Sequence, residues 1–231
     1  YVPKDILLES AIKLLDISSE LIEENLTTLA FSGEIELDSL DGVPVVYQHF
    51  YFQAEQSVTY HIKRIMNGYM PPLAADPDNL INAAEAEERI QLSGDQRKAI
   101  RAALTNKITI ITGGPGTGKT TIINLIVKIF KQMGISVALA APTGRAAKRI
   151  TETSGVEAMT IHRLLEYVYS EDENEMEFGR NLENPLEEDS FIVDEASMID
   201  LMLMDGFLSA LEDDSRLIIV GDADQLPSVG A

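Results

Sequence analysis

The sequence contains no cysteine, which excludes disulfide bonds and thiolate metal sites. No apolar run reaches the ~18 residues that a membrane-spanning helix needs. The first residues, Tyr1-Val2-Pro3-Lys4, lack the basic-then-apolar layout of a secretory signal and resemble an internal start. These absences favour a cytoplasmic protein without a membrane partner, and 231 residues allow one or two domains with a buried core.

Positive charge is scarce and unevenly distributed. The formal net charge is −20, which taken alone argues against a nucleic-acid ligand. Residues 96–150, however, contain ten Lys or Arg residues and no acidic residue, whereas residues 1–95 carry a net charge of −12 and residues 151–231 a net charge of −18. One basic block lies between two acidic ones, so the total charge does not exclude nucleic acid.

Residues 1–70 predict a small helical domain with a hairpin, similar to a winged helix. Helical spacing covers Pro3–Leu15 and Ser19–Phe31, and two short strands meet at the turn Asp41-Gly42. The second helix carries three glutamates and no cation, so phosphates would repel it. We therefore expect this domain to pack or dock rather than bind DNA.

A proline-rich linker and a short acidic helix are expected over residues 71–91. A further domain is expected over residues 92–231, opening with a helix that Ser93 caps. Residues 166–189 hold ten acidic residues and one arginine, which predicts a solvated loop.

Four short apolar strands in this last domain each run into a polar or glycine-rich cluster. Continuous rather than alternating apolar strands, separated by helices, indicate a parallel sheet buried on both faces. The expected strands are Ile108–Ile111, Val137–Ala141, Phe191–Val193 and Leu217–Val220. Because α/β sheets of this kind bind ligands at the carboxyl ends of their strands, we expect all four clusters to meet at one edge.

The first cluster, GGPGTGKT, fits the phosphate-loop pattern G-x-x-x-x-G-K-[ST] completely. Its glycines allow backbone N–H groups to surround phosphate oxygens, and the next helix points its positive end at them. Lys119 is expected to neutralise the β and γ phosphates, and the Thr120 hydroxyl to hold Mg²⁺. The predicted nucleotide-binding residues are Gln96, Gly113, Gly114, Pro115, Gly116, Thr117, Gly118, Lys119, Thr120 and Thr121.

Gln96 has two competing roles. Ser93-x-x-Gln96 is a capping-box pattern, in which the glutamine side chain bonds back to the backbone of the cap. A glutamine ahead of a phosphate-loop strand can instead pair with an adenine, and we favour that role.

Acidic residues follow the third and fourth strands. Asp194 is expected to bind Mg²⁺ through its water shell, and Glu195 to take a proton from the attacking water. Gln225 lies just beyond the fourth strand, where it could contact the γ-phosphate or orient water, while Asp222 could brace the turn. Solvated residues at strand ends are the alternative, and the complete phosphate loop favours catalysis by Lys119, Asp194, Glu195 and Gln225.

The second cluster joins a tight turn to a basic helix start. Pro142, Thr143, Gly144 and Arg145 offer backbone amides, a hydroxyl and a cation, which suit the phosphates of a nucleic-acid strand. A solvated basic helix start is the alternative for this segment.

Taken in order, the segments QRKAI, GGPGTGKTT, APTGRAAKRI, MTIHRLL, FIVDEASMID and VGDADQLPSVG resemble the first half of a superfamily 1 DNA helicase. The RecD-like helicases, which include the α subunit of exodeoxyribonuclease V, are particularly similar over residues 92–231. The resemblance implies a RecA-like ATP-binding domain that moves 5′ to 3′ on single-stranded DNA, and possible partners in a nuclease complex. By the same resemblance, DNA contacts are expected at Thr143, Gly144, Arg145, Thr160 and His162.

Helicases of this kind have a second RecA-like domain, which supplies arginines to the γ-phosphate. The sequence stops just after the loop of the fourth strand, so that partner domain is missing from it. Because an arginine finger raises the rate by ~10³ to 10⁵, we expect this chain to bind Mg-ATP, hydrolyse it slowly and not unwind DNA by itself.

Three alternatives remain from the residues alone. A clamp loader or a kinase would share the phosphate loop, but PTGR and GDADQLP at the other strand ends disfavour both. A nucleotide-gated docking module would not need Lys119, Thr120, Asp194 and Glu195 together. A GTPase is weaker still, since no Asn-Lys-x-Asp motif is present.

Overall fold

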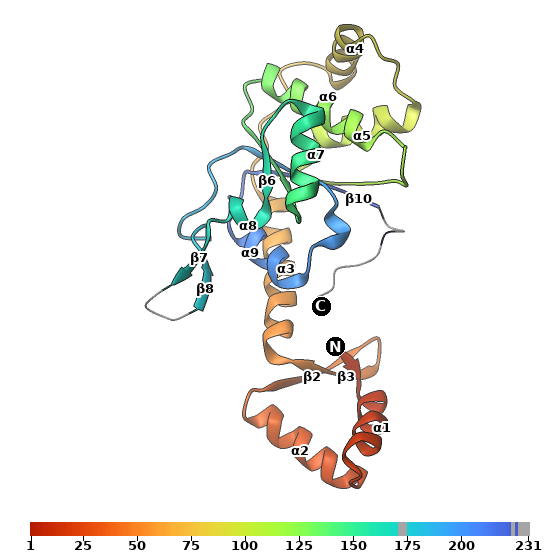
Figure 1. The fold of residues 1–231 in the computed structure, drawn as a ribbon, viewed down its shortest axis with the longest axis vertical. Helices are drawn as coiled ribbons and strands as arrows, with labels where there is room; N and C mark the ends of the chain where they lie inside the picture. The colour runs from red at the N-terminus through yellow and green to blue at the C-terminus, as the bar shows by residue number, and fades with distance from the viewer. Residues whose placement is uncertain (171–174, 223–224, 226–231) are drawn as a thin grey trace. The chain divides into compact units, whose positions relative to one another are not determined.

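The computed structural model describes residues 1–170, 175–222 and 225 of the chain. It divides into two compact units, Tyr1–Thr59 and the residues from Tyr60 onward. Figure 1 labels the elements along the chain, and the division falls inside helix α3 (His49–Asn67). The domain boundaries expected from the sequence stay predictions. No helix in the described ranges is long and apolar enough to cross a membrane.

The first unit contains two complete helices, the first part of α3 and a three-stranded antiparallel sheet in the order β1-β3-β2. Its elements before α3 are β1 (Val2–Pro3), α1 (Lys4–Leu15), α2 (Ser19–Phe31), β2 (Ile35–Leu40) and β3 (Val43–Gln48). Asp41 and Gly42 have φ angles of 50° and 82°, as a two-residue hairpin turn requires. The structure has the predicted order of helix, helix and hairpin, whereas the two-residue strand β1 is too short to leave a periodic signal.

The second unit is built on a five-stranded parallel sheet in the order β4-β10-β9-β5-β6. The predicted parallel α/β sheet is therefore confirmed. Its strands are β4 (Ile108–Thr112), β5 (Val137–Ala141), β6 (Ala158–Thr160), β9 (Ser190–Val193) and β10 (Arg216–Gly221). Its helices are α4 (Pro77–Glu88), α5 (Gly94–Thr105), α6 (Lys119–Gln132), α7 (Gly144–Ser154), α8 (Ile161–Leu164), η1 (Ala196–Met198) and α9 (Leu201–Ser209).

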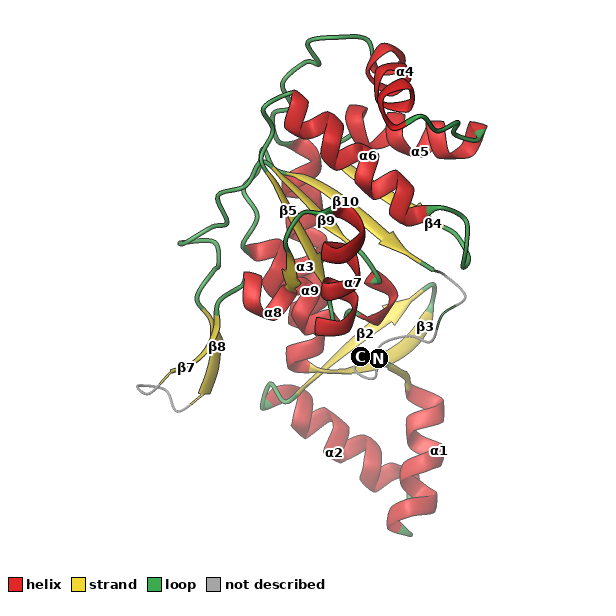
Figure 2. Ribbon diagram, turned by 45° about the horizontal axis from the view of Figure 1, so that its top comes forward, coloured by secondary structure: helices red, strands yellow, loops and turns green. Residues whose placement is uncertain are grey.

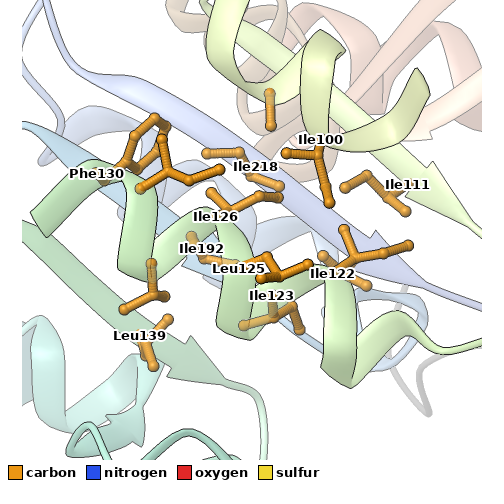
Figure 3. Close-up of a cluster of buried hydrophobic side chains, with 14 of the residues drawn as sticks. Ile100, Ile111, Ile122, Ile123, Leu125, Ile126, Phe130, Leu139, Ile192 and Ile218 are labelled. Carbon is orange, nitrogen blue, oxygen red and sulfur yellow. The ribbon is translucent and has the colours of Figure 1, made fainter. Parts of the chain in front are cut away.

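The main core lies between α6 and one face of the sheet. Figure 2 shows α4, α5 and α6 gathered on that side of the strands, and α6 contacts α4, α5 and α7. In Figure 3, Ile126 and Phe130 of α6 lie over Ile192 and Ile218 of the central strands, while Ile100 enters from α5. All five side chains are at most 1% exposed, so this layer fixes the helix that follows the phosphate loop.

The opposite face of the sheet is covered only in part: α9 packs on β9, whereas Ile110 of β4 is 68% exposed, so the expected burial on both faces does not extend to β4. Phe191 of β9 meets Phe207 of α9 edge to face, with ring centroids 6.0 Å apart. Arg64 at the end of α3 donates to the backbone oxygens of Leu208 and Leu211, at 3.1 and 2.6 Å. These bonds attach residues after Tyr60 to the second unit.

Two features of this unit were not expected. The strand β6 adds to the sheet beside β5, and its three residues are too few to stand out as an apolar run. The acidic stretch 166–189 is not a plain loop, because β7 (Tyr167–Ser170) and β8 (Glu175–Phe178) pair as an antiparallel hairpin. The ring centroids of Tyr167 and Phe178 lie 5.0 Å apart, so the two rings contribute an apolar contact. The high content of acidic residues in this stretch gave no indication of it.

Candidate active site at the carboxyl edge of the sheet

The register of the sheet brings the strand-end clusters to one edge. Thr112 of β4 pairs with Gly221 of β10, two residues past the level at which Val193 of β9 pairs with Ile219. On the other side of β9, the backbone N of Asp194 bonds to the oxygen of Ala140 at 3.0 Å. The phosphate loop, the acidic pair and the basic turn therefore begin at nearly the same level along the strands.

The phosphate loop has the backbone that its glycines predict. Gly116 and Gly118 have φ angles of 77° and 85°, which side chains rarely tolerate. A Cβ at Gly113 would lie 2.8 Å from Oγ1 of Thr117, and that hydroxyl donates to the oxygen of Gly114 at 2.9 Å. The loop thus closes on itself and leads directly into the first turn of α6, where N–H groups can meet an anion.

Lys119 and Thr120 begin the helix that leaves the loop. The Lys119 ammonium donates to the backbone oxygens of Gly113 and Gly114, the second at 3.1 Å. The side chain therefore lies over its own loop, where it can exchange carbonyl oxygens for phosphate oxygens. Both residues are partly exposed, as ligand contact requires.

Gln96 joins the start of α5 to the phosphate loop. Its Oε1 accepts from the backbone N of Ser93 at 3.0 Å, and the Ser93 hydroxyl accepts from the Gln96 N–H at 3.3 Å, which completes the capping box. Its Nε2 donates to the backbone oxygen of Thr117 at 3.0 Å. The capping box is therefore present, and the bond to the loop is a contact that the sequence did not reveal. The adenine contact stays a prediction.

Asp194 is the buried acid of the site, with 4% of its surface exposed. Desolvation raises the pKa of its carboxyl above the usual value, and the neighbouring charge of Glu195 acts in the same direction. The backbone N–H of Glu195, which donates to Oδ1 at 2.9 Å, lowers that pKa, as do the charges of Arg149 and Lys119. A cation near this carboxylate would therefore be favoured electrostatically.

Glu195 has a strained backbone and a half-satisfied carboxylate. Its φ angle is 54°, an uncommon conformation for a residue with a side chain. Oε1 lies 3.5 Å from Nη1 of Arg149, whereas Oε2 is buried without a hydrogen-bond partner among the described atoms. Ser197, two residues on, has a buried Oγ in the same condition. Unsatisfied polar atoms of this kind are typical of ligand and solvent sites.

The donor set suits Mg²⁺ that arrives with phosphates. No group of three or more His, Cys, Asp or Glu residues able to hold a metal occurs in the part of the chain that the structure describes. Magnesium at nucleotide sites needs only one or two protein oxygens beside phosphate oxygens and water. The Thr120 hydroxyl and the Asp194 carboxylate have the chemistry of such ligands, and their role in holding Mg²⁺ stays a prediction.

The candidate DNA-binding residues lie at the ends of β5 and β6. Ala141 pairs with Thr160, so the turn after β5 and the turn after β6 are neighbours. Thr143 caps α7 by accepting from the N–H of Ala146 at 3.3 Å, and Thr160 caps α8 by accepting from that of Arg163 at 3.1 Å. Each hydroxyl keeps its own hydrogen, which can be donated to a phosphate.

The remaining candidates of this group are Pro142, Gly144, Arg145 and His162. Pro142 is partly buried, and the other three are exposed. The ring centroids of His162 and Tyr167 lie 5.3 Å apart. Their contact with DNA stays a prediction.

Gln225 lies beyond β10. The residues immediately before and after it are not among those that the structure describes. Its backbone N donates to the oxygen of Asp222 at 3.3 Å, and Asp222 itself is 3% exposed. A bond between these two residues fits the expected turn. The interpretation of Gln225 as a γ-phosphate sensor stays a prediction.

The fold and the loop together define a RecA-like phosphate-loop domain. A family model described as an AAA domain (AAA_19) matches residues 96–231, more than half of the chain. The ATP-dependent RecD2 DNA helicase of Deinococcus radiodurans is 34% identical over 186 residues, which cover 80% of this chain and 25% of that protein. The RecBCD enzyme subunit RecD of Mycolicibacterium smegmatis is 33% identical over 210 residues, covering 81% and 36%.

Among solved structures, one of two coordinating Pif1 helicases at forked duplex DNA is 22% identical, with a TM-score of 0.46 over 61% of this chain and 35% of that one. The family match and the relatives agree with the motifs described above. The chain belongs to the AAA_19 domain family and, within it, to the RecD-like superfamily 1 helicases. It spans about a quarter to a third of the length of these two curated relatives.

Proposed function

We propose that this chain is the ATP-binding motor domain of an ATP-dependent DNA helicase. The observation that carries the proposal is the common register of the strand ends, which places a phosphate loop, an acidic pair and a basic turn at one edge of one sheet. Membership of the RecD-like family supports it. The docking-module alternative is disfavoured, because it would not require this complete set of residues.

In this proposal the loop binds the phosphates of ATP. The N–H groups at residues 113–120 and the Lys119 ammonium hold the β and γ phosphates, after Lys119 leaves the backbone oxygens of Gly113 and Gly114. Thr120 and Asp194 hold Mg²⁺, which neutralises charge on the transferred phosphoryl group. Gln96 contacts the adenine or steadies the loop through Thr117.

Hydrolysis requires a base beside the γ-phosphate. Glu195 accepts the proton of the attacking water, and no described group is hydrogen-bonded to its Oε2. Gln225 orients that water or contacts the γ-phosphate. Full activity needs an arginine from a second RecA-like domain, which closes over the nucleotide.

Single-stranded DNA crosses the neighbouring strand ends of β5 and β6. Thr143 and Thr160 donate their hydroxyl hydrogens to phosphates, and Arg145 supplies positive charge. These groups take no part in the nucleotide site, so DNA and ATP can bind together. Movement from 5′ to 3′, subunits of a nuclease complex as partners and a cytoplasmic location also belong to the proposal.

The test measures Mg-ATP binding and hydrolysis, with and without single-stranded DNA, for the wild type and Lys119→Ala. Lys131→Ala is the matched control, because Lys131 is an exposed lysine of the same helix. We expect Lys119→Ala to lose hydrolysis by at least ~10²-fold and Lys131→Ala to retain it. Equal hydrolysis in all three proteins would overturn the proposal, and so would the absence of any ATP binding by the wild type.

A further inference from the structure

The carboxylate of Glu195 is held by one side chain of another element. Among the described residues, Glu195 forms one ion pair, in which Nη1 of Arg149 lies 3.5 Å from Oε1 of Glu195. The Glu195 backbone is fixed independently, since its N–H bonds to Asp194 and its oxygen accepts from the N of Met198 at 3.1 Å. Arg149 therefore influences where the carboxylate points, and not the path of the chain.

Arg149 also belongs to the helix that begins at the candidate DNA site. It lies four residues after Arg145 on α7, so both arginines lie on the same face of that helix, one turn apart. The Arg149 side chain is 61% exposed and that of Glu195 is 15% exposed. The arginine is thus free to move, whereas the glutamate is confined.

An ion pair of this kind is weak enough to be exchanged. One partner is largely solvated, and 3.5 Å is at the limit of a hydrogen bond. A DNA phosphate near Arg145 would offer the Arg149 guanidinium a stronger partner, because arginine and phosphate can form two parallel hydrogen bonds. With the guanidinium gone, no other described group is bonded to either oxygen of the Glu195 side chain.

We propose that Arg149 is a positioning residue that couples DNA binding to ATP hydrolysis. Without DNA it holds the Glu195 carboxylate toward α7 and away from the attacking water. When a DNA phosphate takes the guanidinium, Glu195 turns to that water and accepts its proton. The water oxygen then bonds to the γ-phosphorus, the bond from this phosphorus to the bridging oxygen breaks, and ADP and phosphate leave.

This inference rests on the proposed function, in which Glu195 is the base and α7 meets DNA. It goes beyond that function by naming the contact that connects the two sites. A purely structural role for Arg149 would instead lower hydrolysis equally with and without DNA.

The test compares ATP hydrolysis by the full-length protein with no DNA and at saturating single-stranded DNA. Arg149→Ala is expected to raise the DNA-free kcat by up to about fivefold, the size expected for a weak exposed pair. The KM for ATP should not change, and the stimulation by DNA should fall by the same factor. Arg149→Lys should return the DNA-free kcat toward the wild-type value.

Two controls isolate the contact. Lys148→Ala removes a neighbouring cation of α7, which pairs with Glu152 at 3.8 Å, and should leave the DNA-free kcat unchanged. Glu195→Gln combined with Arg149→Ala should show no gain, because the base is absent. An Arg149→Ala protein with an unchanged or lower DNA-free kcat would overturn the inference. If Lys119→Ala still abolished hydrolysis, the proposed function would survive that result, whereas hydrolysis unaffected by Lys119→Ala would overturn both.

Discussion

Nε2 of Gln96 donates a 3.0 Å hydrogen bond to the backbone oxygen of Thr117, across 21 residues of sequence. The same side chain closes the capping box with Ser93. One glutamine thus connects the start of α5 to the loop expected to hold phosphate. Its mutation should therefore affect both helix stability and nucleotide binding.

We predict that Gln96→Ala lowers the free energy of unfolding by about 1 kcal/mol and raises the Kd for Mg-ATP several-fold. Ser93→Ala is the matched control, since it removes the cap without touching the loop. It should cost about the same stability and leave the Kd near the wild-type value. Titration calorimetry and urea unfolding measure the two quantities, and equal Kd changes in both variants would contradict the prediction.

Gly118 and Gly134 allow backbone strain to be separated from phosphate binding. Both have left-handed φ angles, 85° and 73°, but a Cβ at Gly118 would collide with Nε2 of Gln96, whereas one at Gly134 would meet nothing within 4 Å. Each change to alanine should cost about 1–2 kcal/mol of stability from the backbone alone. Gly118→Ala should also raise the Kd for Mg-ATP several-fold, because the added Cβ displaces the Gln96 side chain from the loop, whereas Gly134→Ala should leave the Kd unchanged. Equal increases in Kd in both variants would point to strain as the common cause.

Ile126 and Ile110 test the position of the core. Ile126 of α6 is 0% exposed, and Ile110 of β4 is 68% exposed. Ile126→Ala should lower the free energy of unfolding by about 2–5 kcal/mol, because it leaves a cavity beneath the phosphate-loop helix. Ile110→Ala should cost less than about 1 kcal/mol. Chemical denaturation of the two variants measures this difference, and equal losses would show that the face opposite α6 is also buried.

His61 predicts a dependence of stability on pH. It is 5% exposed, its Nδ1 accepts from Nε of Arg64 at 3.2 Å, and burial, with the Arg64 charge, lowers its pKa below 6.5, while Asp205 opposes that shift. Because the folded state then binds a proton less readily than the unfolded state, its contribution to stability is complete above pH 6.5 and declines as pH falls through that value.

We therefore expect the free energy of unfolding to fall between about pH 7.5 and about pH 5.5 more in the wild type than in His61→Leu. Urea denaturation at the two pH values provides the measurement. His162→Leu, which changes an exposed histidine, should keep the wild-type difference. If His61→Leu kept it as well, another group would have to cause the pH dependence.

The strand-end clusters show how far the sequence predicts this site. Phe191–Val193 and Leu217–Val220 are apolar at every position, which distinguishes buried parallel strands, and the phosphate loop is a local motif with local geometry. We could predict that the strand-end clusters meet at one edge, because the carboxyl ends of parallel strands lie at the same edge of a sheet. The hairpin β7–β8 was missed because its pairing depends on partners across a turn and not on composition.

By itself, the sequence determined the parallel sheet, the helix that Ser93 caps, the helix after the phosphate loop, and the residue types at each strand end, because apolar periodicity and glycine conformations are local properties. Only the tertiary structure decided that Gln96 bonds to Thr117 and that Arg149 reaches Glu195. Those contacts join residues 21 and 46 positions apart. They exist because the strand order places β9 beside β5 and α5 beside α6, an arrangement that packing of the whole core selects.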